Sequence, residues 1–140
     1  MMQLPPVLVA VLLAGILSQG LKIVLLIALK RQQFTPKDLV VTGGMPSSHS
    51  AVVVALVVSL YLTEGLSNLF IICAVLAAIV IRDALGVRRT AGEEGKLLNK
   101  VIQHIHYRTK PVHYSLGHTP MEVAVGVLIG IVAGFIILVL

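Results

Sequence analysis

Charged residues are scarce in this 140-residue chain, making up 12% of it against 57% for hydrophobic residues. With a mean hydropathy of +0.99, a water-soluble globule is excluded, because so few charges would leave too much apolar surface in water. Alternating segments of about ten residues, the mark of a membrane β-barrel, do not recur. In lipid, a helix satisfies its backbone polar groups internally. The composition therefore predicts an all-α integral membrane protein.

Cysteine is nearly absent. The single Cys73 excludes an internal disulfide, and its apolar surroundings predict a small buried hydrophobe. The N-terminus lacks a basic stretch and a small-residue cleavage motif, so the apolar run at 4–29 is expected to remain as a spanning helix. No cysteine or carboxylate cluster accompanies His104, His106 and His113. We therefore expect no metal site and no cofactor.

Four apolar runs organise the chain into one predicted domain over residues 1–140. Three of them, near 4–29, 66–84 and 120–140, provide the length of about 20 residues that a helix needs to cross the hydrocarbon core. The fourth, near 46–62, is long enough only if the polar residues at its start belong to the same helix. Polar residues at membrane depth cost free energy unless they face a protein interior or a wet cavity. The pattern predicts a bundle of about four spans.

The connections between these runs predict the orientation. The segments 30–44 and 82–117 are basic, whereas the turn at 63–68 contains Glu64 and no lysine or arginine. By the positive-inside rule the basic loops are cytoplasmic, and the turn and both termini lie outside. The net charge of +5 is thus an orientation signal and does not indicate nucleic-acid binding. Residues 93–107 are amphipathic and predict an interfacial helix, on the lipid or over the bundle.

The string GGMPSSHS at residues 43–50 is a flexible turn that leads into a helix. Pro46 suits the first helical position, where its missing N–H costs nothing. The free N–H groups after it form an anion site to which Ser47, Ser48 and His49 add donors. The alternative is an ordinary capped helix start with an interfacial histidine. Phosphate is the natural ligand of the first interpretation.

A second pattern stands at the start of the last span. His118 and Glu122 are four residues apart, which on a continuous helix lets the carboxylate hold the imidazole tautomer and stabilise its charged form. His118 would then act as a nucleophile or base. The competing interpretation is a capping box, with Thr119 as N-cap, Pro120 at the first position and Glu122 reaching back. One carboxylate is able to serve both roles.

A third pattern, Arg82, Asp83, Arg88 and Arg89, follows the third span. The first two residues pair with each other in the simplest interpretation, and the last two mark the cytoplasmic side. The alternative assigns Arg88 or Arg89 to phosphate binding, because a guanidinium offers two parallel donors to phosphoryl oxygens.

Lys22 and Gln19 interrupt the first apolar run on one helical face. Lys22 either snorkels to the interface or points inward to an anion. In the predicted topology, all these patterns meet at one membrane side. His49, His118, Lys22 and an arginine placed together indicate metal-free phosphoryl transfer, in which one histidine attacks phosphorus and the other protonates the leaving oxygen.

Three strings, GGMPSSHSA, DALGVRR and LGHTPMEV, resemble the divergent branch of the type 2 phosphatidic acid phosphatase superfamily, which is related to acid phosphatases and vanadium haloperoxidases. The resemblance covers nearly the whole chain. It implies a phosphate-binding role for Ser47, an acid role for His49, a nucleophilic role for His118 and a carboxylate-partner role for Glu122. Ser48 stands where the superfamily motif has glycine.

The superfamily's Ser-Arg before the nucleophilic histidine and its Lys-x6-Arg-Pro motif are both missing here. Arg88 or Arg89 and Lys22 are the cations available to replace them. The leading hypothesis is a membrane phosphatase that hydrolyses a lipid phosphate or pyrophosphate through a phosphohistidine. The alternative is a noncatalytic anionic-lipid binder or carrier on the same fold. A transporter is disfavoured, because the polar residues gather at one face. The expected partners are a membrane lipid phosphate and a second copy in a homodimer, and no nucleic acid.

Overall fold

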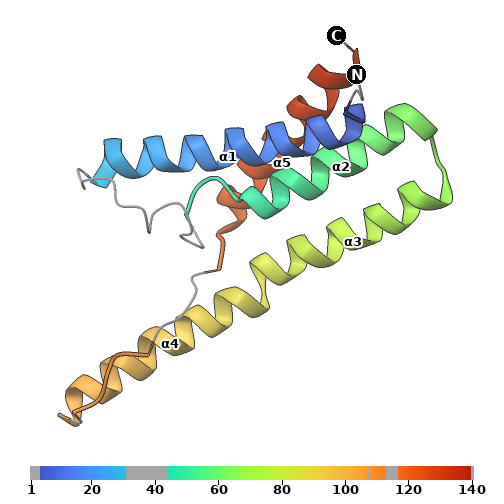
Figure 1. Cartoon of the computed structure of the whole chain (residues 1–140). Helices are drawn as coiled ribbons and strands as arrows, with labels where there is room; N and C mark the ends of the chain where they lie inside the picture. Colours follow the sequence, from blue (N-terminus) through green and yellow to red (C-terminus); the bar gives the residue numbers. More distant parts are fainter. Residues whose placement is uncertain (1–3, 31–43, 107, 113–116, 140) are drawn as a thin grey trace.

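The computed structural model describes residues 4–30, 44–106, 108–112 and 117–139, and within these ranges it contains helices and no strand (Figure 1). An all-α fold is therefore confirmed. Three helical stretches are long and apolar enough to cross a membrane, and one helix is shorter and apolar. The helices are α1 (Pro6–Lys30), α2 (Ser48–Glu64), α3 (Asn68–Leu85), α4 (Val87–His104) and α5 (Pro120–Val139).

The short helix α2 lies at the centre of the bundle and packs against α1, α3 and α5. Its 17 residues give a length of about 26 Å, slightly less than the roughly 30 Å hydrocarbon core. Five of its residues are buried: Ser50, Ala51, Ala55, Ser59 and Leu60. Four of the five are alanine or serine, so neighbouring helices approach its backbone closely. Ser47 and Ser50 at the polar start of α2 are buried inside protein.

The start of α2 differs from the sequence expectation, which placed Pro46 at the first helical position. Ser47 is the N-cap instead, and the helix begins at Ser48. The Ser47 hydroxyl accepts a hydrogen bond from the Ser50 backbone N–H at 3.4 Å and another from the Ser50 hydroxyl at 2.9 Å. A serine oxygen satisfies a free N–H of the first turn, which proline is unable to do. Pro46 therefore precedes the cap.

A row of glycines on α5 allows it to pack against α2. A Cβ atom at Gly126 would lie 2.3 Å from the Ser47 carbonyl oxygen, and one at Gly130 would lie 2.4 Å from the Ala51 carbonyl oxygen. Membrane helices associate through such small residues because lipid provides little hydrophobic drive between them. The order of these contacts shows that α2 and α5 run parallel. Both helices consequently begin at the same end of the bundle.

Gly130→Ala is expected to lower the free energy of unfolding by about 1–3 kcal/mol, the usual cost of overpacking. The matched control is Gly20→Ala on α1, where a Cβ would meet nothing within 4 Å. There the better helix propensity of alanine predicts a small gain of up to roughly 1 kcal/mol. Unfolding of each variant in detergent micelles, followed by circular dichroism against denaturant, measures both changes. Equal effects of the two substitutions would contradict this account of the α2–α5 contact.

The remaining helices extend from this core. α3 packs on α2 and contacts α5 only weakly, and among the helices α4 contacts α3 alone. α4 begins directly after Gly86, six residues before the amphipathic helix expected at 93–107. Figure 1 shows α4 continuing roughly the line of α3 beyond the other helices. The sequence from 87 to 92 therefore extends the helix back to the end of α3.

Candidate functional site

The buried His118 and the Glu122 carboxylate form the centre of the site. His118 precedes α5 and is 5% exposed, and its Nδ1 atom lies 3.1 Å from Oε2 of Glu122. The same oxygen accepts the Thr119 backbone N–H at 3.1 Å, and the Thr119 hydroxyl accepts the Glu122 N–H at 3.3 Å. The two interpretations of this motif are thus both present in the structure. One carboxylate caps α5 and also contacts the imidazole.

Four helices meet around the backbone of His118. Its N–H donates to the Ala84 carbonyl oxygen near the end of α3 at 3.0 Å, and the Glu122 carbonyl oxygen accepts the Ser47 N–H at 3.0 Å. Gly117 lies against the first turn of α4, where a Cβ atom would be 2.3 Å from the backbone nitrogen of Arg89. The starts of α2, α4 and α5 and the end of α3 therefore meet around His118.

The first helix contributes Lys22 and Gln19. Lys22 is only 6% exposed and lies within electrostatic range of Glu122, so it points into the bundle and does not reach for the interface. Gln19 accepts a hydrogen bond from the Ser48 hydroxyl through its Oε1 atom at 2.9 Å. This bond links α1 to the first turn of α2 one helical turn from the lysine. A positive charge is thereby placed beside the histidine–carboxylate pair.

His49 occupies the outer edge of the site. Its side chain is exposed, in contrast to those of His118 and Lys22, and it lies within electrostatic range of both of them and of Arg88 and Asp83. The structure thus brings the two histidines and the lysine to one end of the bundle. An exposed histidine next to a buried one is suited to exchange protons with solvent.

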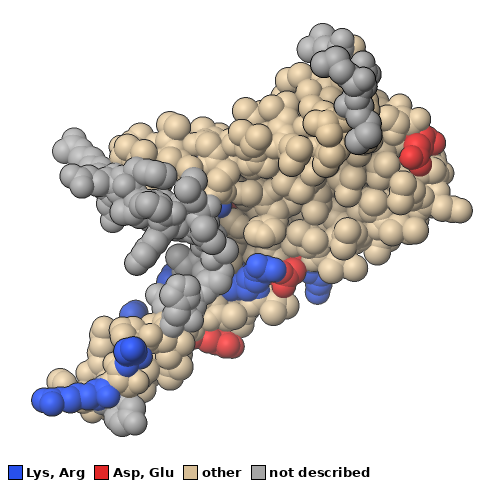
Figure 2. All heavy atoms as spheres, in the orientation of Figure 1, with Lys and Arg blue, Asp and Glu red and all other residues tan. Residues whose placement is uncertain are grey.

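The arginines are more exposed and already paired. Arg88 forms an ion pair with Asp83, and Arg89 pairs with Glu93 at 3.1 Å. Asp83 therefore uses Arg88 rather than its neighbour Arg82, which was the pairing that the sequence indicated first. Figure 2 shows the lysines and arginines of this face gathered over the α3–α4 end of the molecule. Arg88 borders the site, whereas Arg89 contributes its backbone through the contact with Gly117.

Two contributors were not recognised in the sequence. The sequence pattern indicates Asp83 only as a partner of Arg82, yet Asp83 lies within electrostatic range of His49. The signal for this residue in the sequence is the spacing of five residues between Asp83 and Arg88, which lie on either side of Gly86. Ala84 contributes only a carbonyl oxygen, which no side-chain pattern reveals.

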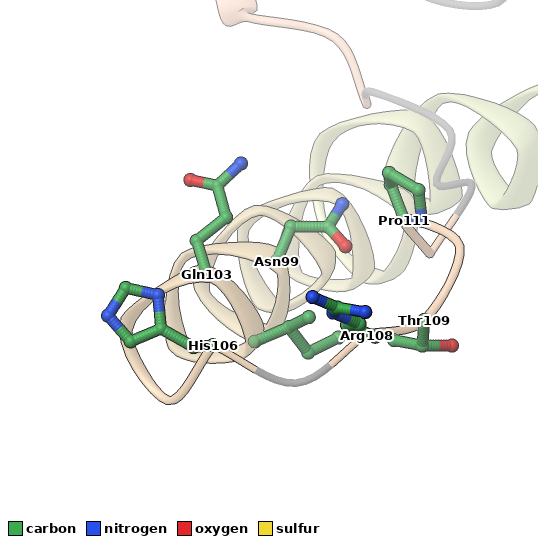
Figure 3. Close-up of a pocket in the computed structure, with 7 residues that line it drawn as sticks. Asn99, Gln103, His106, Arg108, Thr109 and Pro111 are labelled. Carbon is green, nitrogen blue, oxygen red and sulfur yellow. The ribbon is translucent and has the colours of Figure 1, made fainter.

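Within the described ranges, no group of three or more His, Cys, Asp or Glu side chains is placed to hold a metal ion. A pocket of about 420 Å³ lies elsewhere, at the end of α4 (Figure 3), and Asn99, Gln103, His106, Arg108 and Thr109 are among its lining residues. His104 is exposed, and His113 lies outside the described residues. The pocket is separate from the histidine–carboxylate pair.

Fold and site together define a class: a small helical membrane protein with a buried histidine–carboxylate pair where several helices begin or end. The chain belongs to the Divergent PAP2 family, whose model matches residues 5–133. It is 42% identical over 106 residues to "Uncharacterized membrane protein YuiD" of Bacillus subtilis (strain 168), across 64% of this chain and 67% of that protein. No solved structure matches it. The predicted family is thereby confirmed, and the chain is a membrane protein.

Proposed function

We propose that the chain is a membrane phosphatase that hydrolyses a lipid phosphate or pyrophosphate through a phosphohistidine intermediate. The observation that carries the proposal is the buried His118, whose Nδ1 atom is held by Glu122 at 3.1 Å. A carboxylate on Nδ1 fixes the tautomer whose Nε2 lone pair is the nucleophile, and it stabilises the charge that develops on the ring.

The reaction has two steps. In the first, Nε2 of His118 attacks phosphorus, the bond from phosphorus to the leaving oxygen breaks, and protonated His49 gives its proton to that oxygen. In the second, His49 takes a proton from water as the water oxygen attacks phosphorus, and the phosphorus–nitrogen bond breaks to release phosphate. The exposure of His49 supports this role, because the acid must meet water in the second step.

Cations and helix N-termini would bind the phosphoryl oxygens. Lys22 is the buried positive charge at the site, and Arg88 approaches from the α3–α4 end. Ser47 and Ser48 stand at the start of α2, where free N–H groups favour an anion. The Ser47 hydroxyl already accepts two hydrogen bonds, so it would serve phosphate as a donor.

A lipid substrate follows from the location of these groups. They lie at the end of an apolar bundle, where the phosphate of a membrane lipid stands while its chains remain in the hydrocarbon region. The positive-inside rule supports a cytoplasmic site, with both termini on the other side of the membrane.

A second candidate function is noncatalytic binding or carriage of an anionic lipid. It is favoured by the pairing of the cations and donors near the site: Arg88 with Asp83, Arg89 with Glu93, and Ser48 with Gln19. Groups that are already paired bind a head group by exchange of partners, which requires no nucleophile.

Phosphate release by the purified protein in detergent tests the proposal. Diacylglycerol phosphate, polyprenyl phosphate and polyprenyl pyrophosphate are supplied with EDTA, and binding of the same lipids is measured in parallel. Release from any of them supports the phosphatase. Binding of a lipid with no release across the panel would favour the carrier, and neither binding nor release would reject both functions.

A further inference from the structure

Helix α4 carries an apolar stripe that the other described helices leave uncovered. Its members, Leu97, Leu98 and Val101 on α4 and the C-cap residue Ile105, are 46–63% exposed. Their spacing puts them on one face of the helix. Because α4 packs against α3 alone among the helices, the stripe does not lie over the bundle, one of the two positions expected from the sequence.

Cations border one edge of this stripe. Lys96 and Lys100 are exposed and occupy the helical face next to the apolar side chains. Glu94 lies one turn before the stripe begins, and Glu93 is paired with Arg89. The helix is therefore positively charged along the part that is apolar.

Residues 108–112 fold back along a different face of α4, the one that carries Asn99 and Gln103. The Asn99 side chain fixes this segment, since its amide donates to the Val112 carbonyl oxygen at 2.9 Å and accepts the Val112 N–H at 2.8 Å. The segment adds two exposed cations, Arg108 and Lys110. Figure 3 shows Arg108 and Pro111 on the side of α4 toward which Asn99 extends. The segment thus adds positive charge to this end of the molecule and does not cover the stripe.

The position of α4 in the chain places it at a membrane face. It starts at Gly86, where α3 ends, and α3 lies in a stretch that is long and apolar enough to cross a membrane. A helix whose apolar stripe is bordered by cations binds in the interface of an anionic bilayer. We propose that α4 binds anionic phospholipid head groups, with its stripe inserted among them.

The positive charge beside the stripe favours anionic lipid over a second copy of the chain as the partner that covers it. Pairing two stripes would bring Lys96 and Lys100 of one copy close to the same cations of the other, whereas anionic head groups neutralise them. Binding along the surface requires α4 to turn away from the line of α3 in Figure 1. Gly86 supplies the joint, because its φ of −105° and ψ of −94° already interrupt the helix.

A fluorescent probe on the full chain tests the proposal. Val101→Cys, in a Cys73→Ser background, is labelled with the environment-sensitive dye NBD and placed in nanodiscs with one copy per disc. Gln103→Cys on the opposite face is the labelling control. In discs of phosphatidylcholine with phosphatidylglycerol, the dye at position 101 should shift to the blue and resist quenching by iodide. In phosphatidylcholine alone it should remain quenchable, and the control should be quenchable in both.

The dependence of dye protection on the charge of α4 distinguishes binding of anionic lipid from coverage of the stripe by protein or neutral lipid. Neutralising Lys96 and Lys100 with glutamine should weaken the protected state by about fivefold for each cation. Glu94→Gln, which removes one charge of the opposite sign, should preserve or strengthen it. Quenching in both kinds of disc would overturn the proposal. Equal protection in both would also overturn it, because protein or neutral lipid would then cover the stripe.

Discussion

His118→Asn is expected to reduce phosphate release by about 10⁴-fold or more. Removal of a covalent nucleophile lowers turnover on this scale in other enzymes. Asparagine is smaller than histidine and has an amide that is able to reach Glu122, but its nitrogen has no lone pair available to attack phosphorus. The backbone bond from residue 118 to the Ala84 carbonyl oxygen does not depend on the side chain. The variant should therefore fold and bind lipid while losing turnover.

Two measurements separate catalysis from binding in this variant. Release of phosphate and the dissociation constant of the same lipid are determined side by side, and the wild type is quenched during turnover to trap an acid-labile phosphoenzyme. The expected result is trapped phosphate on the wild type and none on His118→Asn, with affinities within a few-fold. Unchanged release in the variant would exclude His118 as the nucleophile.

The long apolar runs made the helices predictable, because length and hydropathy alone identify segments that cross a membrane. The uncertain segment was α2, whose start depended on local chemistry. Both Pro46 and Ser47 are good residues for a helix start, and the sequence favoured the proline at the first position. The structure has Ser47 as the cap, since its hydroxyl is anchored by Ser50 and its N–H by the Glu122 carbonyl oxygen. The second anchor is a contact between helices that no local pattern encodes.

The geometry of the candidate site likewise depends on contacts between helices that no local pattern encodes. His118 and Glu122 were found from their spacing, yet the spacing presented a capping box and a histidine–carboxylate pair as rivals. They coexist because His118 lies before the helix, held by Ala84 and by the close approach of Gly117 to Arg89. These backbone contacts between distant segments decide where the imidazole points. Side-chain identity indicated which residues to consider, and tertiary contacts determined their geometry.

Glu122→Gln should separate the two roles of this carboxylate. Glutamine is a normal member of a capping box, so the start of α5 should remain folded and the free energy of unfolding should change by less than about 1 kcal/mol. The negative charge beside Nδ1 of His118 is lost, however, and the tautomer is no longer enforced. In a catalytic triad the equivalent loss lowers turnover by about 10⁴-fold, and we expect a fall of at least about 10²-fold here.

Thr119→Ala is the matched control, because it removes the hydroxyl that accepts the Glu122 N–H and leaves the carboxylate on His118. It should cost about 1 kcal/mol of stability with turnover within a few-fold of the wild type. Unfolding in detergent and phosphate release are measured on both variants. Opposite patterns in the two variants would establish that the carboxylate acts on the imidazole beyond its structural role. If both variants lost stability and turnover together, Glu122 would be a cap alone, and the orientation of His118 would have to come from the Ala84 and Gly117 contacts.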